Sequence, residues 1–424
     1  MSQKVRAGMQ VKLNSKRRKL LFALLCLAAA GLYLTVVARH YAAARLSAQL
    51  DATSLARAAR LEAWNAEPRW ELGRYSLFVA QDPTAAVSNL EAAVALNPHA
   101  ARYWLDLAAA YQVAGDIPRQ RFALDQGLQA EPTAPDVAWE AANFYLVQND
   151  MARALSLFRV VMANDPEQLN AALSLCWRAT RDVNRLLADA VPAKPAPYFA
   201  LLNLLISQRQ TKAAEVVWNG LASLGQQFPA SNAFPFMDYL IEQHEASAAV
   251  KAWQLLLARN HDMQGYVQPG NLIVDGSLEK EFLNGGFDWR YSDTGAVQFS
   301  IDNSEFHGGT QSLRMAFSGP GGSDPGIFQY VPVRPNTNYH FNAYTKAEDI
   351  ESASGPRLAV LDAYSGKEYV LTDDSLGTTG WREQSADFQT GPESPLVIVK
   401  VTRVPGDPLI KGKFWIDDLS LAQR

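Results

Sequence analysis

The chain has very little cysteine. Its 424 residues include only Cys26, in an apolar N-terminal stretch, and Cys176, far downstream. Because these two cysteines are not expected to meet, we expect no disulfide. Two cysteines are also too few for a cysteine-based zinc site. A chain of this length can bury enough surface to fold without disulfides, so the scarcity does not exclude an extracytoplasmic location.

The sequence also lacks the motifs of common enzyme classes. HExxH, GxSxG and GxxxxGK[ST] are absent, and the six histidines are scattered without metal-ligand spacing. Residues 319–322 are rich in glycine but no lysine follows them, and the adjacent Asp373 and Asp374 are interpreted as solvated turn residues. We therefore predict that the protein is not an enzyme. The catalytic alternative is a glycan-active enzyme with two carboxylates on distant strands.

Basic residues are concentrated at one end of the chain. Residues 1–19 contain seven Lys and Arg and no Asp or Glu. The whole chain has 39 basic and 43 acidic residues, so removing these seven leaves 32 against 43, a net charge of −11. Phosphate backbones are bound by clustered Lys and Arg, so an acidic body of this kind predicts no nucleic-acid partner.

A long apolar run follows the basic tail. Residues 20–37 (LLFALLCLAAAGLYLTVV) carry no charge over 18 residues, about the minimum that crosses a bilayer core. We predict a transmembrane helix over 20–38, with a cleaved signal peptide as the alternative. Basic flanks stay in the cytoplasm. We therefore expect a single-pass protein of the inner membrane with its N-terminus inside and the bulk of the chain periplasmic or otherwise extracytoplasmic.

A repeat of 34 residues follows a connector over 39–66 that we expect to be helical. Residues of one kind recur at this spacing: Pro98, Pro132 and Pro166; Trp70 and Trp104; Tyr111 and Tyr145. Ala108 and Ala142 occupy equivalent positions, where we expect small residues to be buried between crossing helices. The pattern resembles the tetratricopeptide repeat, a helical hairpin. The resemblance implies an all-α solenoid over 67–264, less regular after 168.

This resemblance implies a protein partner held in a groove lined by the first helix of each repeat. The residues expected there are Tyr75, Arg102, Trp139 and Asn143. The lysine and asparagine clamp of chaperone-docking members is absent. The alternative is that these aromatic side chains pack within or between the repeats, and the inference of a partner rests on family analogy.

From about residue 265 the sequence favours an all-β sandwich that continues to 424. Short alternating stretches are separated by Gly, Pro and Ser, as is typical of half-buried strands joined by turns. The predicted strands are 296–302, 311–317, 326–333, 338–346, 357–363, 381–389, 395–403 and 412–421. Trp381 and Trp415 are expected to pack between the two sheets of this sandwich.

Five segments of this region resemble the carbohydrate-binding modules of families 4 and 9, a jelly roll with a galactose-binding-like fold. They are NLIVDGSLE (271–279), HGGTQSLRM (307–315), YVPVRPNTNYHFNAYTKAE (330–348), GWREQSADFQT (380–390) and GKFWIDDLSL (412–421). The resemblance implies glycan binding on aromatic side chains, for which the candidates are Trp289, Tyr291, Tyr364 and Tyr369, with Tyr344 in addition. Arg290, Asp293 and Gln298 are candidate polar partners. The alternative for Trp289 is packing on the sandwich.

The same resemblance implies a structural calcium ion, which takes oxygen ligands. The matching carboxylates are Glu279 and Asp417, with Asp418 as a substitute and backbone carbonyls of 307–309 as further ligands. The alternative is that these are surface carboxylates without a metal. No other cofactor is expected.

These features together predict a membrane-anchored, non-enzymatic scaffold or binding protein in envelope or exopolysaccharide assembly, export or retention. In this interpretation the sandwich contacts polysaccharide and the repeats bind a protein partner. The first alternative is a protein–protein assembly factor in which the sandwich is a structural cap. The second is the glycan-active enzyme.

Overall fold

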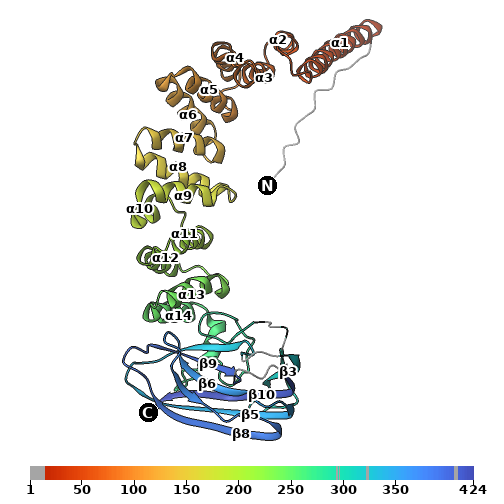
Figure 1. The fold of residues 1–424 in the computed structure, drawn as a ribbon. Helices are drawn as coiled ribbons and strands as arrows, with labels where there is room; N and C mark the ends of the chain where they lie inside the picture. Colours follow the sequence, from red (N-terminus) through yellow and green to blue (C-terminus); the bar gives the residue numbers. More distant parts are fainter. Residues whose placement is uncertain (1–14, 293–294, 296, 321–323, 405–408) are drawn as a thin grey trace, which may run out of the picture. The chain divides into compact units, whose positions relative to one another are not determined.

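The computed structural model describes the chain except for residues 1–14, 293–294, 296, 321–323 and 405–408. The chain divides into two compact units, one up to Ala172 and one from Leu173 to Arg424, and each is described by itself. As predicted, helices occupy the N-terminal part and an antiparallel β-sandwich the C-terminal part (Figure 1). This division lies well before 264/265, the boundary predicted from the sequence, so the second unit contains helices as well as the sandwich.

The first unit opens with a long helix, α1 (Lys16–Ser47), capped by the side chain of Ser15. The apolar run lies within it. Among the described residues it is the one helix long and apolar enough to cross a membrane, and a signal sequence near the N-terminus would look the same. The connector expected to be helical contains the end of α1 and a separate helix, α2 (Ala52–Leu61).

Helical hairpins with a constant period make up most of the rest of this unit, which ends within α9 (Leu169–Thr180). Their helices are α3 (Ala66–Phe78), α4 (Pro83–Leu96), α5 (Ala101–Ala114), α6 (Ile117–Ala130), α7 (Pro135–Val147) and α8 (Met151–Asn164). The second helix of each hairpin begins after an aspartate whose side chain accepts a backbone N–H in its first turn. These caps are Asp82, Asp116 and Asp150, 34 residues apart.

Packing inside the hairpins follows the same period. Ala108 and Ala142 are buried, as expected for small residues where helices meet. The hydroxyl of Tyr111 donates to Glu91 at 2.6 Å. One period later, Tyr145 donates to Asp125 at 2.7 Å. The region is therefore a helical repeat of 34 residues, and its assignment to the tetratricopeptide family stays a prediction.

The second unit begins with further helices. These are most of α9 (Leu169–Thr180), then α10 (Val183–Asp189), α11 (Pro195–Ser207), α12 (Thr211–Ser223), α13 (Phe234–Glu242) and α14 (Ala246–Arg259), with 3₁₀ turns η1 (Ala230–Ala233) and η2 (His261–Tyr266). Trp218 and Trp253 are buried among them. The Trp218 ring lies 5.5 Å from the ring of Phe236, which joins α12 to α13.

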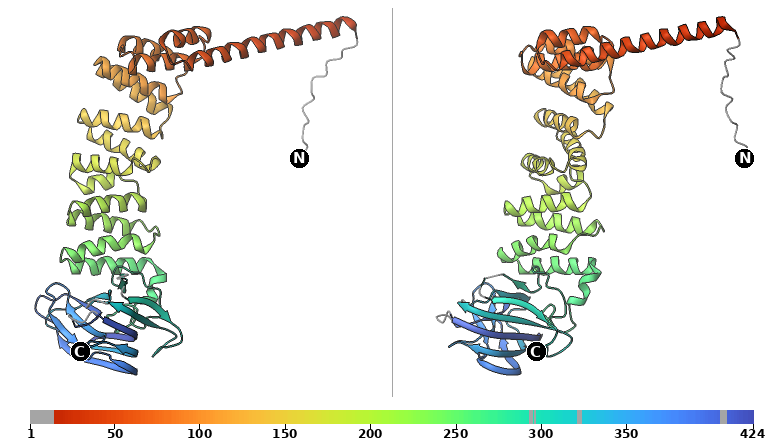
Figure 2. Two further views of the ribbon diagram at one scale, coloured as in Figure 1. Left: turned by 45° about the vertical axis from the view of Figure 1, so that its right-hand side comes forward. Right: turned by 90° about the vertical axis from the view of Figure 1, so that its right-hand side faces the viewer.

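Two five-stranded antiparallel sheets form the sandwich (Figure 2). One has the order β1 (Arg290–Tyr291), β4 (Ile327–Pro332), β9 (Leu396–Thr402), β6 (Arg357–Asp362), β7 (Glu368–Leu371). The other has the order β2 (Val297–Asp302), β3 (Ser312–Pro320), β10 (Leu409–Gln423), β5 (Asn338–Glu351), β8 (Gly377–Gln389). All eight predicted strands are confirmed, whereas the short β1 and β7 were not predicted.

A loop at 283–290 attaches the sandwich to the last helical hairpin. A Cβ added to Gly285 would lie 2.3 Å from the Phe234 ring, and one added to Gly286 would lie 2.5 Å from the Trp253 ring. Arg290 forms an ion pair with Asp238 of α13. These contacts explain why the last helices and the sandwich belong to one compact unit.

Candidate functional site

The outward-facing side of the sheet β2-β3-β10-β5-β8 is called the outer sheet face. On β5, Tyr339, Phe341 and Ala343 point into the core, so the alternate residues Asn342 and Tyr344 point outward. Tyr344 pairs across the strands with Glu383 of β8, and Asn342 pairs with Ser385. Several side chains able to hydrogen-bond are therefore gathered beside Tyr344.

Trp381 lies on this outer sheet face, so the expectation that it packs between the sheets is wrong. It is half-buried on the edge strand β8 and is absent from the sandwich core. Phe388 and Ala386 are the residues of this strand that pack in or against the core. The Trp381 ring lies 6.0 Å from the ring of His307.

Trp415 also points to the outer face, contrary to the same expectation. Its neighbours Phe414 and Ile416 belong to the core between the sheets. The Trp415 indole N–H donates to Asp302 Oδ2 at 3.0 Å, and the ammonium of Lys346 lies 5.4 Å from its ring centroid. These polar neighbours bury the ring, so it does not present a free face.

A loop at 303–311 covers part of the outer sheet face. The His307 ring stacks on Tyr344 with centroids 3.5 Å apart, and its Nδ1 lies 2.7 Å from Asp418 Oδ2. Lys346 is bonded to Glu305 of the same loop. The loop therefore forms a wall beside Trp381 and covers one face of Tyr344.

The three predicted calcium ligands all contact this loop. Asp417 Oδ2 accepts the backbone N–H groups of His307 and Gly308, at 2.7 and 3.1 Å. Glu279 accepts the N–H and hydroxyl of Thr310, both at 2.6 Å. Asp418 bonds His307 as described. The carboxylates thus fix the loop to the first segment and the last strand of the sandwich.

The pKa values of these carboxylates reflect the same contacts. Burial raises the pKa of Asp417, against the lowering effect of the loop N–H groups. Burial also acts to raise the pKa of Glu279, but the hydrogen bonds from Thr310 outweigh it and the net pKa is lowered. Within the described ranges no three acidic, histidine or cysteine side chains converge on one point. The side chains alone do not form a cation cage, so calcium stays a prediction that depends on loop carbonyls.

Trp289 cannot serve as a sugar platform, and that expectation is wrong. Its side chain is 0% exposed and belongs to the core between the sheets. Its indole N–H donates to the carbonyl of Asp275 at 3.2 Å. The structure confirms the alternative prediction, that Trp289 packs on the sandwich.

Tyr291 lies apart from the other candidates. It is 44% exposed, and its ring lies 6.3 Å from that of Phe282 and 6.0 Å from that of Phe299. These three rings line a cavity of about 250 Å³ with mostly apolar neighbours. Of the polar side chains expected beside it, Arg290 is bonded to Asp238, Gln298 is exposed on β2, and Asp293 lies outside the described residues.

Tyr364 and Tyr369 lie together in what we call the junction pocket, a cavity of about 570 Å³. Tyr364 stacks on His244 of the helical part, with ring centroids 4.2 Å apart. Tyr369 accepts the N–H of Gly391 on its hydroxyl and packs on Phe388, with ring centroids 5.4 Å apart. Burial raises the pKa of Tyr364 to about 12, so its hydroxyl is neutral. Two of the four predicted glycan residues are thereby brought to one cavity.

The predicted partner-binding residues lie on three different helices of the first unit. Tyr75 is half-buried on α3. Arg102 on α5 pairs with Glu67 and lies 4.5 Å from the Trp70 ring. On α7, Trp139 packs edge-on against Phe158 and its carbonyl accepts the amide of Asn143 at 2.8 Å. Arg102, Trp139 and Asn143 thus make contacts within the repeats, and a partner for them stays a prediction.

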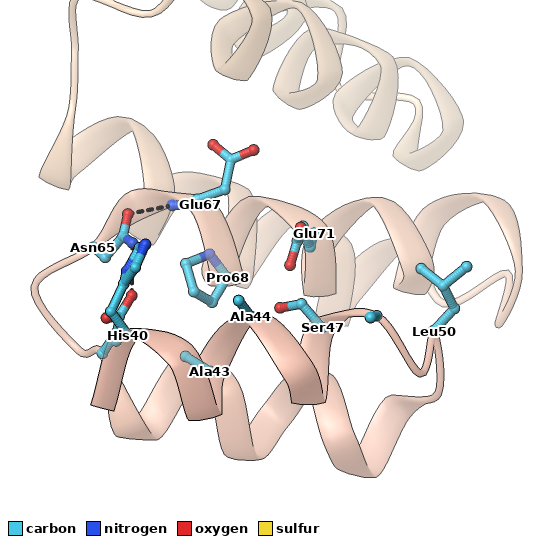
Figure 3. A pocket seen from close by; sticks show the side chains of 11 residues that line it. His40, Ala43, Ala44, Ser47, Leu50, Asn65, Glu67, Pro68 and Glu71 are labelled. Atoms are coloured by element: carbon cyan, nitrogen blue, oxygen red, sulfur yellow. Dashed lines mark hydrogen bonds and ion pairs between the residues drawn. The ribbon is translucent and has the colours of Figure 1, made fainter. Parts of the chain in front are cut away.

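A further pocket of about 400 Å³ lies where the end of α1 packs against the α2–α3 region (Figure 3). His40 Nδ1 lies 3.0 Å from Glu62 Oε1, and the Asn65 amide donates to Glu62 Oε2 at 2.8 Å. Asn65 also accepts the N–H of Glu67. The pocket contains none of the predicted site residues, and the contact of His40 with Glu62 attaches α1 to the end of α2.

Comparison with protein-family models finds no match, and comparison with curated proteins finds none. Among solved structures, the chain is similar to a family 4 carbohydrate-binding module, with 14% identity and a TM-score of 0.28 over 36% of this chain and 99% of that one. It is also similar to a family 16 carbohydrate-binding module, with 24% identity and a TM-score of 0.27 over 36% of this chain and 99% of that one. It is also similar to MamA, with 12% identity and a TM-score of 0.27 over 41% of this chain and 85% of that one.

Proposed function

We propose that this chain is a membrane-anchored, non-enzymatic binding protein whose β-sandwich binds glycan on the outer sheet face. The observation that carries the proposal is the position of Trp381, half-buried on an edge strand beside Tyr344 and His307. Sugar rings present apolar faces that pack on aromatic rings, while their hydroxyls need polar partners at the edge. Asn342, Glu383 and Ser385 supply such groups on the neighbouring strand positions.

The rest of the chain suits a role in presenting this surface. The apolar α1 supports a membrane anchor, and the helical repeats support a protein partner along their length. From these features we infer a part in envelope or exopolysaccharide assembly, export or retention. We also propose that the partner of the repeats is a protein and that the N-terminus of α1 lies in the cytoplasm.

The junction pocket is the second candidate glycan site, because Tyr364 and Tyr369 both line it. Its tyrosine rings are stacked on other rings, whereas the Trp381 ring meets that of His307 edge-on, with centroids 6.0 Å apart. Tyr364 is stacked on His244, and Tyr369 is stacked on Phe388 with the ammonium of Lys367 5.2 Å from its ring centroid. We therefore rank this pocket below the outer sheet face.

Titration of the full chain in detergent with fragments of envelope polysaccharide tests the proposal. A shallow, wet surface predicts a Kd on the order of micromolar to millimolar. Trp381→Ala should weaken binding by about tenfold or more, which corresponds to about 1.4 kcal/mol. Tyr364→Ala should change it little. Trp64→Ala is a matched control, since Trp64 is an exposed tryptophan far from the sandwich in sequence.

Each contrary outcome has a defined meaning. Loss of binding in folded Tyr364→Ala but not in Trp381→Ala would move the site to the junction pocket. Absence of binding to every glycan tested would favour the assembly-factor function. The ion pair of Arg290 with Asp238 favours that second function, because it fixes the sandwich to the last hairpin as a cap would be fixed.

A further inference from the structure

The loop at 283–290 encloses a carboxyl group that the proposed function does not use. Asp288 is 0% exposed. Its Oδ2 accepts the N–H of Leu283 at 2.7 Å, and its own N–H donates to Gly285 O at 3.2 Å. Its Oδ1 is buried and accepts no hydrogen bond within the described part of the chain. One oxygen of this carboxyl is therefore left without a hydrogen bond among the described residues.

Asp288 stands at the centre of the attachment between the sandwich and the last hairpin. Gly285 and Gly286 precede it and pack against Phe234 and Trp253. The next residue but one, Arg290, binds Asp238 of α13 and the carbonyl of Gly286. A change in the shape of this loop therefore changes how α13 and α14 are held.

The charged groups around Asp288 offset only part of the cost of ionising it, because its pKa stays raised. The charge of Arg290 lowers the pKa of Asp288, but Nη2 of this guanidinium is bonded to Asp238 and to the carbonyl of Gly286. Asp275 is a second buried carboxylate, and its charge acts against ionisation of Asp288. Tyr266 of η2 is neutral and also lies within this group. Lys280 and Glu279 face Asp275 through their backbone N–H groups.

We propose that Asp288 is a proton-operated switch for this attachment, closing the loop onto α13 and α14 when neutral and loosening it when ionised. A buried charge without a partner is costly, whereas a neutral carboxyl is tolerated in the same place. The geometry is independent of any glycan, so the proposal stands apart from the proposed function.

The direction of the pH effect follows from the surroundings. Burial raises the pKa of Asp288 to about 7, the charge of Asp275 adds to this, and the N–H groups of Leu283 and Trp289 and the charge of Arg290 oppose it. The folded-state pKa is thus above the ordinary value of 3.8. The contribution of Asp288 to loop closure is complete below about pH 4 and is lost as the pH rises through about 7.

Hydrogen exchange of the full chain in detergent, followed by mass spectrometry at pH 5.5 and 8.5, tests the switch. After correction for intrinsic exchange rates, peptides covering 281–290 should lose protection about tenfold or more at the higher pH. Asp288→Asn, a neutral isostere, should keep its protection at both values. Asp373→Asn changes an exposed aspartate and should behave like the unmodified chain.

Two results would overturn the proposal: equal protection of this loop at both pH values, or an unchanged pH response in folded Asp288→Asn. If Asp288→Asn does not fold, Asp275→Asn provides the second variant. Removing the charge of Asp275 should move the midpoint of the loop's pH response to lower pH. A midpoint that does not move would show that Asp288 is not the titrating group.

Discussion

His307 lies flat on Tyr344, with ring centroids 3.5 Å apart and ring planes 11° apart. This contact makes the loop at 303–311 a wall of the outer sheet face. The carboxylates of Asp417 and Glu279 fix this loop by accepting the backbone N–H groups of His307 and Thr310. A change in these carboxylate contacts should therefore change the position of the loop that borders the proposed glycan surface.

The first prediction concerns calcium at these carboxylates. An ion that binds only the folded state raises stability by mass action. If loop carbonyls complete a site with Glu279 and Asp417, EDTA should lower the melting temperature of the full chain in detergent and calcium should restore it. Glu279→Gln should remove most of this difference. Superimposable melting curves with EDTA and with calcium would contradict a calcium site and would show that these carboxylates only hydrogen-bond the loop.

The second prediction concerns the helical repeat. Ala142 on α7 is fully buried where helices meet. Replacing it with leucine adds a side chain to a packed site and should cost about 1–3 kcal/mol. Thermal unfolding of the full chain measures the effect. Val147→Ala on the same helix is the control, because Val147 is 81% exposed and its loss should change stability little. Equal stability of Ala142→Leu and the unmodified chain would disprove the packing register.

The fold could be predicted from the sequence where periodicity is strong. The 34-residue spacing of Pro, Trp and Tyr predicts hairpins of constant length, and the aspartate caps at that spacing confirm them. Alternation over six or more residues predicts the eight longer strands. The two-residue β1 and the four-residue β7 are too short for a recognisable alternation.

The site was less predictable because alternation does not show which side of a strand is the core. Trp381 and Phe388 are both large and hydrophobic, so the sequence favours neither for the core, and the register of β8 shifts next to Trp381. Trp415 lies between two core residues for the same reason. Trp289 is in a loop, where no period exists, and its burial depends on distant parts of the chain such as Asp275.

The third prediction concerns topology. The seven basic residues before the apolar run predict that the N-terminus stays in the cytoplasm. A reporter active only in the periplasm, fused after Arg424, should therefore be active. Moving the basic charge to the other flank, by replacing Lys16, Arg17, Arg18 and Lys19 and adding lysines after residue 38, should lower this activity. Activity of a cytoplasm-only reporter at the same position would contradict the orientation.

The last prediction concerns acid stability at Asp302, which lies beneath the Trp415 indole on the outer sheet face. Burial acts to raise its pKa, but hydrogen bonds from Ser304 and Trp415 lower it to about 2. A depressed pKa gives stability that is present above about pH 4 and lost as the pH falls through 2. Asp302→Asn should therefore cost about 2 kcal/mol at pH 7 and little near pH 2, measured by denaturant unfolding of the full chain. The exposed Asp373→Asn is the control, and an equal cost of Asp302→Asn at both pH values would contradict the assignment.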